Sequence, residues 1–264
     1  MIRKISVSFI FLTVLYWPVV LPAATPVIAI IIDDLGTNWK QAEKVLSLPK
    51  EVTTSILPFT PHAKKIAERA SEQGRSIMLH VPMEADEKNE LLGPGALRSS
   101  MNGWQLIEQL RADIVSLPKI VGINNHMGSQ LTREESTMKW VMLMLRWQGL
   151  YFIDSRTTSE SVAQTVANSM GVLSSSRDVF LDHEINVAAI DKQFQRAIKI
   201  AKKTGYAIII GHPHDETIAV LRKRIPLLKA AGIKLVSPEK IIQGRAKARQ
   251  SNNAHVISFS SLFE

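Results

Sequence analysis

Five of the seven histidines of the chain lie at or just after the ends of apolar, β-branched runs that predict strands: His80, His126, His183, His212 and His214. Four aspartates follow the same kind of run: Asp33, Asp34, Asp154 and Asp182. Imidazole and carboxylate groups in a chain without cysteine suit a divalent transition metal such as zinc, with iron, cobalt or manganese as alternatives. The same groups can exchange protons near neutral pH, so this pattern also indicates acid–base chemistry.

Each of these residues also has a purely structural interpretation. One aspartate after a strand is an ordinary turn or helix-capping residue, but two adjacent ones, Asp33 and Asp34, favour a function. A lone histidine in an apolar run, such as His80, is more often a hydrogen-bonded core residue, but its convergence with the other strand-end histidines favours a function. His126 lies among Asn, Gly and Ser, where packing gives no reason for an imidazole.

His212 and His214 follow the most hydrophobic predicted strand after the N-terminal segment, and we expect at least one of them to be functional. Asp154 has a structural alternative, because it can pair with Arg156 or cap the next helix. His183 and the Glu184 beside it are explained equally well by a surface strand end.

The predicted elements alternate between strands and helices. Apolar runs predict strands at 27–32, 52–57, 76–81, 120–123, 150–153, 179–181, 207–210 and 233–236. Helical spacing predicts helices at 38–48, 61–73, 103–116, 133–148, 159–170, 190–204 and 214–231. Thr132 and Glu135 resemble a capping box, and glycines that suit helix C-termini follow three of the helices: Gly149, Gly205 and Gly232.

Nearly continuous apolar strands separated by helices predict a parallel sheet covered on both faces. Seven or eight such units favour a closed or nearly closed barrel over an open doubly wound sheet. No Gly-x-Gly-x-x-Gly follows the first strand, which argues against a dinucleotide-binding fold. In a parallel barrel the carboxyl ends of the strands open on one face, so we expect the histidines and aspartates to converge there.

The first 24 residues predict a secretory signal peptide. Arg3 and Lys4 precede an apolar stretch at 5–20, and small residues at 23–24 suit cleavage. The stretch falls short of the roughly 20 residues of a membrane-spanning helix, although an uncleaved anchor is the alternative. We therefore expect a periplasmic or secreted protein that meets a membrane only through this segment.

Composition describes one globular domain. The 264 residues are 45% hydrophobic and 21% charged, with no cysteine, which excludes a disordered chain, a disulfide scaffold and thiolate chemistry. The net charge of +8 comes from scattered residues, and no basic stripe interleaved with aromatics indicates nucleic-acid binding. We expect a signal peptide at 1–24, one domain at 25–243 and a polar C-terminal tail at 244–264.

Five strings of residues resemble the divergent polysaccharide deacetylase family, the YibQ-like proteins, over roughly residues 26–243. They are Ile32–Gly36, Leu79–Glu84, Gly122–Ser129, Phe152–Ser155 and Gly211–His214, of which the Asn-Asn-His-Met-Gly-Ser string in the third is the most specific. The resemblance implies an α/β fold, a distorted (β/α) barrel of about seven parallel strands as in glycoside hydrolases and deacetylases. It also implies a metal-dependent hydrolase of carbohydrate C–N bonds, acting on a polysaccharide or peptidoglycan.

The resemblance also suggests a role for each site residue. Asp33 corresponds to the base, and Asp34 and His80 correspond to metal ligands. The resemblance does not supply the third ligand, which we expect to be His126 from another strand. His212 or His214 corresponds to the general acid, and Asp154 would orient a histidine or the base. The wider superfamily has a second histidine four residues after the first, where this chain has Glu84, and its arginine-containing third motif has no clear match.

Two other functions remain open at the level of sequence. A barrel without turnover could serve as a periplasmic glycan-binding or envelope partner protein, which the missing second histidine favours. A metallohydrolase acting on phosphoesters is a third interpretation, with Arg156 as the nearest basic residue. The paired aspartates and the His-Pro-His string favour the deacetylase, because a pure binding protein needs neither base nor acid.

Overall fold

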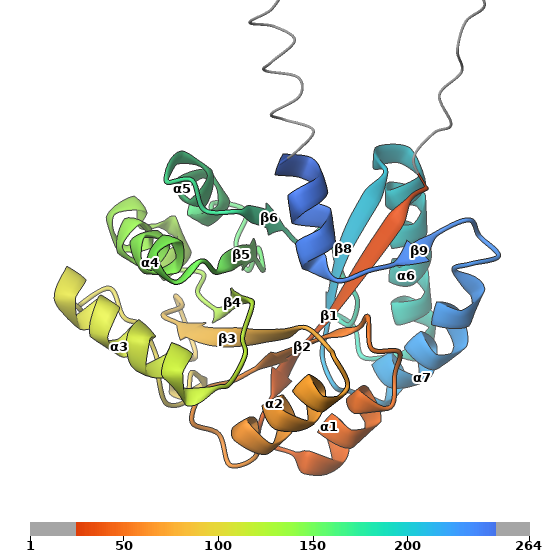
Figure 1. The fold of residues 1–264 in the computed structure, drawn as a ribbon, viewed down its shortest axis with the longest axis horizontal. Helices are drawn as coiled ribbons and strands as arrows, with labels where there is room; N and C mark the ends of the chain where they lie inside the picture. Colours follow the sequence, from red (N-terminus) through yellow and green to blue (C-terminus); the bar gives the residue numbers. More distant parts are fainter. Residues whose placement is uncertain (1–24, 247–264) are drawn as a thin grey trace, which may run out of the picture.

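The computed structural model describes residues 25–246, in which parallel strands alternate with helices (Figure 1). The strands are β1 Val27–Leu35, β2 Thr53–Ile56, β3 Ile77–Met83, β4 Gly122–Met127, β5 Tyr151–Asp154, β6 Ser174–Ser176, β7 Val179–Phe180, β8 Tyr206–Gly211 and β9 Lys234–Leu235. The helices are α1 Trp39–Leu46, α2 Ala63–Glu72, α3 Gly103–Ser116, α4 Glu135–Gln148, α5 Ala163–Ser169, α6 Val187–Thr204 and α7 Asp215–Arg224. Three short 3₁₀ helices cover Asn89–Leu91, Leu131–Arg133 and Ile225–Leu227.

The strands form one curled parallel sheet in the order β6-β5-β4-β3-β2-β1-β8-β7, with β9 paired to the start of β1. The expected α/β fold with a barrel-like sheet is confirmed, but the main order holds eight strands instead of about seven. The additional strand is β6. It consists of three serines, so no apolar pattern in the sequence predicts it.

The curled sheet does not pair its two ends, because β6 and β7 stand at opposite ends of the strand order. Residues Arg177 and Asp178 connect β6 to β7. Arg177 donates its backbone N–H to Asp154 O on β5 (3.0 Å), and Asp178 donates its own to Ile208 O on β8 (2.8 Å). The backbone therefore crosses from one edge of the sheet to the other and brings the end of β7 beside the end of β8.

The core has two layers, which explains the near-continuous apolar strands. On β1, Ile28, Ile30 and Ile32 belong to the large cluster beneath the outer helices, whereas Ala29 and Ile31 face the inside of the curl. A helix at residues 238–246 covers the inner layer at the amino ends of the strands, between β6 and β8 in Figure 1. Its buried side chains join those of the inner strands in one cluster: Ala29, Ile31, Met78, Tyr151, Ile153, Ile208, Ile210, Val236, Ile241 and Ile242.

Two helix boundaries, the start of α4 and the end of α7, differ from the prediction. Thr132 does not cap α4, because its hydroxyl donates to Gly128 O within a 3₁₀ turn and α4 begins after Glu134. The predicted helix at 214–231 ends at Arg224, since Pro226 cannot continue the hydrogen-bond ladder. Gly149 and Gly205 end α4 and α6 in the left-handed conformation, as expected (φ 68° and 89°).

The predicted signal peptide at 1–24 and most of the predicted C-terminal tail lie outside the described residues. Gly244 and Arg245, assigned to that tail, belong to the helix at 238–246, and Arg245 donates to Ser175 Oγ on β6 (2.7 Å). Among residues 25–246, no helix is long and apolar enough to cross a membrane.

Candidate metal centre and active site

A local irregularity at the end of β1 turns two adjacent aspartates toward one cavity. Neighbouring side chains of a regular strand point to opposite faces. The register between β1 and β2 shifts between Ile32 and Leu35, and Asp34 has a left-handed backbone (φ 56°). As a result, Asp33 and Asp34 both line the cavity, the first almost fully buried and the second 35% exposed at its side chain.

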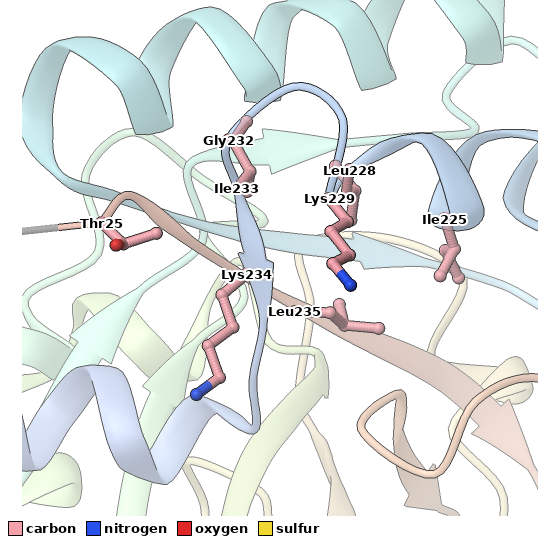
Figure 2. A pocket seen from close by; sticks show the side chains of 8 residues that line it. All are labelled: Thr25, Ile225, Leu228, Lys229, Gly232, Ile233, Lys234 and Leu235. Atoms are coloured by element: carbon pink, nitrogen blue, oxygen red, sulfur yellow. The ribbon is translucent and has the colours of Figure 1, made fainter.

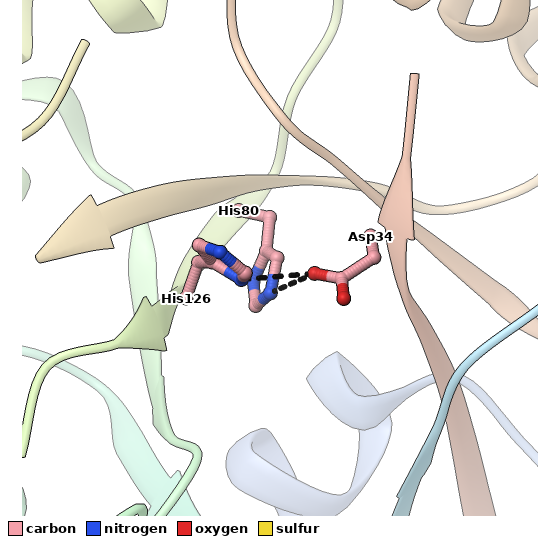
Figure 3. Close-up of side chains that lie close together, drawn as sticks. All are labelled: Asp34, His80 and His126. Carbon is pink, nitrogen blue, oxygen red and sulfur yellow. Dashed lines mark ion pairs between the residues drawn. The ribbon is translucent and has the colours of Figure 1, made fainter. Parts of the chain in front are cut away.

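Asp34 meets two histidines from the neighbouring region of the sheet. Its Oδ1 lies 2.9 Å from His126 Nδ1 and 3.2 Å from His80 Nε2 (Figure 3). β3 and β4 pair in register, with His80 opposite Asn124, so His126 is two residues further along the same face of β4. One ligand atom from each of the three residues lies within 4.8 Å of the others. The structure thus brings together Asp34, His80 and His126, the three ligands suggested by the sequence.

The donor set fits a divalent cation of the zinc type. Asp34 Oδ1 is buried and makes no hydrogen bond, although two imidazole nitrogens face it. Burial alone raises the pKa of Asp34, but the contacts with His126 and His80 outweigh it and hold the pKa well below its usual range. A carboxylate kept ionised between two imidazoles is a suitable cation ligand, and nitrogen–oxygen sets of this kind are common at zinc sites.

Asn124 connects the candidate base to one of the candidate ligands. Its Nδ2 donates to both oxygens of Asp33, at 2.9 and 3.0 Å. Its Oδ1 accepts from Ser55 Oγ (2.6 Å) and faces His80 Nδ1 at 2.9 Å. Since Oδ1 can only accept, Asn124 keeps a proton on His80 Nδ1, so Nε2, the nitrogen that faces Asp34, is the one that can give up its proton and bind a cation. Asn124 therefore fixes the orientation of the carboxylate and the tautomer of the imidazole at once.

His212 approaches Asp34 from the other side of the cavity. Its Nε2 lies 3.8 Å from Asp34 Oδ2, and its Nδ1 lies 2.9 Å from Asp182 Oδ1. Asp182 follows β7, and it also accepts from the His212 backbone N–H and from Thr217 Oγ1. Burial lowers the pKa of His212, but the Asp182 hydrogen bond and the charges of Asp34, Asp182 and Asp33 raise it to about 9. His212 is thus held protonated at neutral pH.

Two of the predicted catalytic residues stand apart from this centre. Asp154 is fully buried and accepts from the Arg156 backbone N–H (2.8 Å) and from Ser161 Oγ (2.7 Å), so it organises the turn after β5 without an ion pair to the Arg156 side chain. His214 does not line the cavity; it precedes α7, with its ring 6.0 Å from that of His212.

Glu84, which follows His80 by four residues, does not reach the cavity either. Its carboxylate accepts from Ser99 N–H (2.6 Å) and Ser99 Oγ (2.5 Å). The histidine that joins His80 is supplied by the next strand, through His126.

The cavity has a volume of about 450 Å³, within the roughly 300–1,000 Å³ common for small-molecule sites. Its wall also includes His183, one of the strand-end histidines, and Arg156, the basic residue of the phosphoester alternative. The other lining residues were not singled out by the sequence: Asn125, Met127, Ser155, Thr157, Arg177, Phe180 and Ile210. Asp182 and Asn124 were likewise missed as partners of His212 and Asp33. Asp182 could have been found, because it follows a predicted strand immediately, as Asp33 and Asp154 do.

A second cavity of about 470 Å³ lies at the opposite ends of the strands, beside Thr25 and β9 (Figure 2). Its lining is mainly apolar with two lysines, Lys229 and Lys234, and contains neither carboxylate nor imidazole. The groups with catalytic potential are therefore concentrated at the carboxyl ends of the strands.

Comparison with known proteins shows the family and the fold of the chain. The sequence profile of the divergent polysaccharide deacetylase family matches residues 30–242. The uncharacterized protein YibQ of Escherichia coli K12 is 37% identical over 216 residues, which cover 80% of this chain and 67% of the relative. The crystal structure of an uncharacterized protein from Agrobacterium tumefaciens C58 superimposes with a TM-score of 0.80 at 25% identity, over 84% of this chain and 91% of that one.

A structure described as T48 deacetylase with substrate shares the fold at lower similarity. It has a TM-score of 0.51 and 14% identity, and the match covers 83% of this chain and 92% of that one.

Proposed function

Since the chain belongs to the divergent polysaccharide deacetylase family, we propose that it is a metal-dependent hydrolase that removes N-acetyl groups from an envelope or extracellular polysaccharide. One observation carries the proposal: Asp33, His212 and the group Asp34, His80 and His126 face one cavity. A binding site alone needs no buried carboxylate and charged imidazole on opposite sides of a cation site.

The candidate metal ligands are Asp34, His80 and His126, and zinc is the cation that their chemistry favours. When bound there, such a cation supplies Lewis-acid polarisation of the acetyl carbonyl and lowers the pKa of water. His80 is kept in the correct tautomer by Asn124, which supports its role as a ligand.

Asp33 is the proposed general base. It is buried beside the cavity, and its Oδ2 lies 3.7 Å from His80 Nε2. The Asn124 amide contacts both carboxylate oxygens and holds the group in place. Asp33 takes the proton from the water that attacks the acetyl carbon.

His212 is the proposed general acid, in preference to His214. His212 lines the cavity with Nε2 toward Asp34, whereas His214 does not line it. Its pKa of about 9 keeps a proton available at neutral pH. His212 Nε2 gives that proton to the departing amine nitrogen, while Asp182 stabilises the imidazolium through Nδ1.

The location of the reaction follows from the N-terminal sequence. A charged start, an apolar stretch and small residues near position 24 support export through a signal peptide. We therefore propose a periplasmic or secreted enzyme whose substrate is a glycan of the envelope, peptidoglycan included.

The test separates metal binding from turnover. We expect purified protein to bind about one equivalent of zinc and to release acetate from N-acetylated oligosaccharides, with both properties lost in the Asp34→Ala, His80→Ala double variant. Asp33→Asn should retain zinc and lose at least about 100-fold in rate, in the range of a general base. The matched control is Asp191→Asn. It alters an ion pair between Asp191 on α6 and Arg224 on α7, away from the cavity, and should behave like the parent.

The second candidate is a glycan-binding protein without turnover. It is favoured by Glu84, which stands in place of the superfamily's second histidine. The Glu84 carboxylate accepts hydrogen bonds from Ser99. Zinc binding without acetate release from any acetylated glycan, together with saturable binding of those glycans, would support this alternative and contradict the hydrolase.

A further inference from the structure

Two arginines share the cavity with the candidate catalytic groups. Arg156 comes from the turn after β5, and Arg177 comes from the two-residue crossing between β6 and β7. Neither is required by the proposed proton transfers. Both lie in the wall formed by β5 and β7, which His183 also joins.

Arg177 is held rigidly by the backbone of its neighbours. Its Nε donates to Ser155 O (2.7 Å), and one terminal nitrogen donates to Arg156 O (2.9 Å). The guanidinium lies over the ring of Phe180, 5.0 Å from its centroid. These contacts use only part of the five N–H donors of an arginine and leave donors for a ligand.

Arg156 adopts a strained backbone conformation at the edge of the cavity. Its φ is 52°, in the left-handed region that residues other than glycine rarely adopt. The Asp154 carboxylate accepts the Arg156 backbone N–H and holds this turn. The guanidinium itself makes one long hydrogen bond, 3.4 Å to Ser159 O, so it is available to a ligand.

The two positive charges have no direct partner. Within residues 25–246, both guanidinium groups hydrogen-bond only to carbonyl oxygens, and no ion pair joins either to a carboxylate. Burial lowers the pKa of Arg177; the charges of Asp154 and Asp33 oppose that lowering, and the charge of Arg156 adds to it. The carboxylates of the same cavity, Asp33 and Asp34, face Asn124 and the two histidines. A cation at Asp34 would make the cavity more positive still.

We propose that Arg156 and Arg177 form a subsite for an anionic substituent, a carboxylate or a phosphate, carried by the sugar whose N-acetyl group lies at Asp33 and Asp34. This inference rests on the proposed function and narrows its substrate to an acidic glycan. A planar guanidinium suits both anions because it presents parallel N–H donors to two oxygens.

Equilibrium binding to sugars that differ in one group tests the subsite. The probes are N-acetylglucosamine, its 3-O-lactyl ether (N-acetylmuramic acid) and its 6-phosphate, titrated calorimetrically into the full chain with and without zinc. We expect at least one acidic probe to bind about tenfold or more tightly than the neutral sugar, in line with hydrogen bonds to charged groups. The preference should decrease at high salt.

Variants assign the preference to the arginines. Arg156→Met should abolish the preference for the acidic probe, and Arg156→Lys should restore part of it. Arg69→Met, on the outer surface of α2, is the control and should keep the full preference. Equal affinity for neutral and acidic probes in the parent, or a preference that survives Arg156→Met, would overturn the proposal.

The same samples separate this subsite from the proposed hydrolysis. Acetate release from a neutral N-acetylated oligosaccharide reports turnover without involving an anionic group. Tighter binding of an acidic probe without acetate release from any probe would support the subsite and contradict the hydrolase. Acetate release with equal affinity for neutral and acidic probes would support the hydrolase and contradict the subsite. Preference for only one of the two acidic probes would identify the anion as carboxylate or phosphate.

Discussion

Asn124 positions two groups of the candidate site at once, the proposed base and one candidate metal ligand. It is fully buried, and its amide contacts Asp33, His80 and Ser55 together. Because the amide cannot rotate without losing all three contacts, the base and the ligand are positioned as one unit. The site is thereby organised before any cation or substrate arrives.

Replacing Asn124 should therefore weaken metal binding without removing a ligand. Asn124→Ala frees the His80 tautomer, and we expect the dissociation constant for zinc to rise about 10–100-fold, as for other partners of metal-bound histidines. Competition against a chromophoric chelator measures this constant. Asn186→Ala, which removes only the cap of α6, is the control. An unchanged affinity in the Asn124 variant would show that His80 needs no such partner.

At this scale the sequence pointed to the titratable residues of the candidate site better than to the residues that support them. Asp33, Asp34, His80 and His126 were recognisable because titratable groups after apolar strands are unusual. Asn124 lies in the same string as His126, but an asparagine has no pattern that distinguishes a buried support from a loop residue. Arg177 was hidden because it follows a strand of three serines, Ser174–Ser176.

At the scale of elements, the apolar strands were predicted well, but the helix ends that are set by polar side chains were not. The strands around 27–32 and 207–210 were predictable because both of their faces are buried. The start of α4 was misplaced since the Thr132 hydroxyl bonds within the preceding turn, a choice that spacing alone does not reveal.

Close packing between β4 and β5 gives a prediction of its own. Gly122 lies opposite Tyr151, and a Cβ built on it would come within 2.4 Å of the tyrosine ring. We expect Gly122→Ala to destabilise the fold by about 1–3 kcal/mol, as overpacking does in other cores. Urea denaturation measures the difference. Gly244→Ala meets nothing within 4 Å and is the control, and equal stability of both variants would contradict this packing.

For the molecule as a whole, one buried carboxyl makes stability depend on pH. Asp113 on α3 is fully buried, and burial raises its pKa to about 7 despite a hydrogen bond from Gln109. The unfolded chain loses this proton near pH 4, whereas the folded chain keeps it until about pH 7. Stability is therefore lost as the pH rises through this window, by up to about 4 kcal/mol for three pKa units.

Asp113→Asn should remove that loss. We expect the variant to be more stable than the parent at pH 8 and nearly equal to it at pH 4, as measured by chemical denaturation across the range. Glu108→Gln on the same helix alters an exposed pair with Arg111 and should follow the parent curve. Parallel curves for the parent and Asp113→Asn would show that Asp113 is ionised in the folded state.

The central position of β1 has a consequence for how the chain reaches this structure. β1 obtains one neighbour early, from β2, but its other long edge pairs with β8, where Ile30 lies beside Ile209. Until the last third of the chain is available, this very apolar strand presents an unpaired edge, the kind of surface that recruits other chains. Its pairing with β8 joins residues far apart in sequence, which slows folding. Synthesis that halts before β8 should therefore yield aggregation-prone fragments, and the chain should depend on chaperones that shield it until its end has emerged.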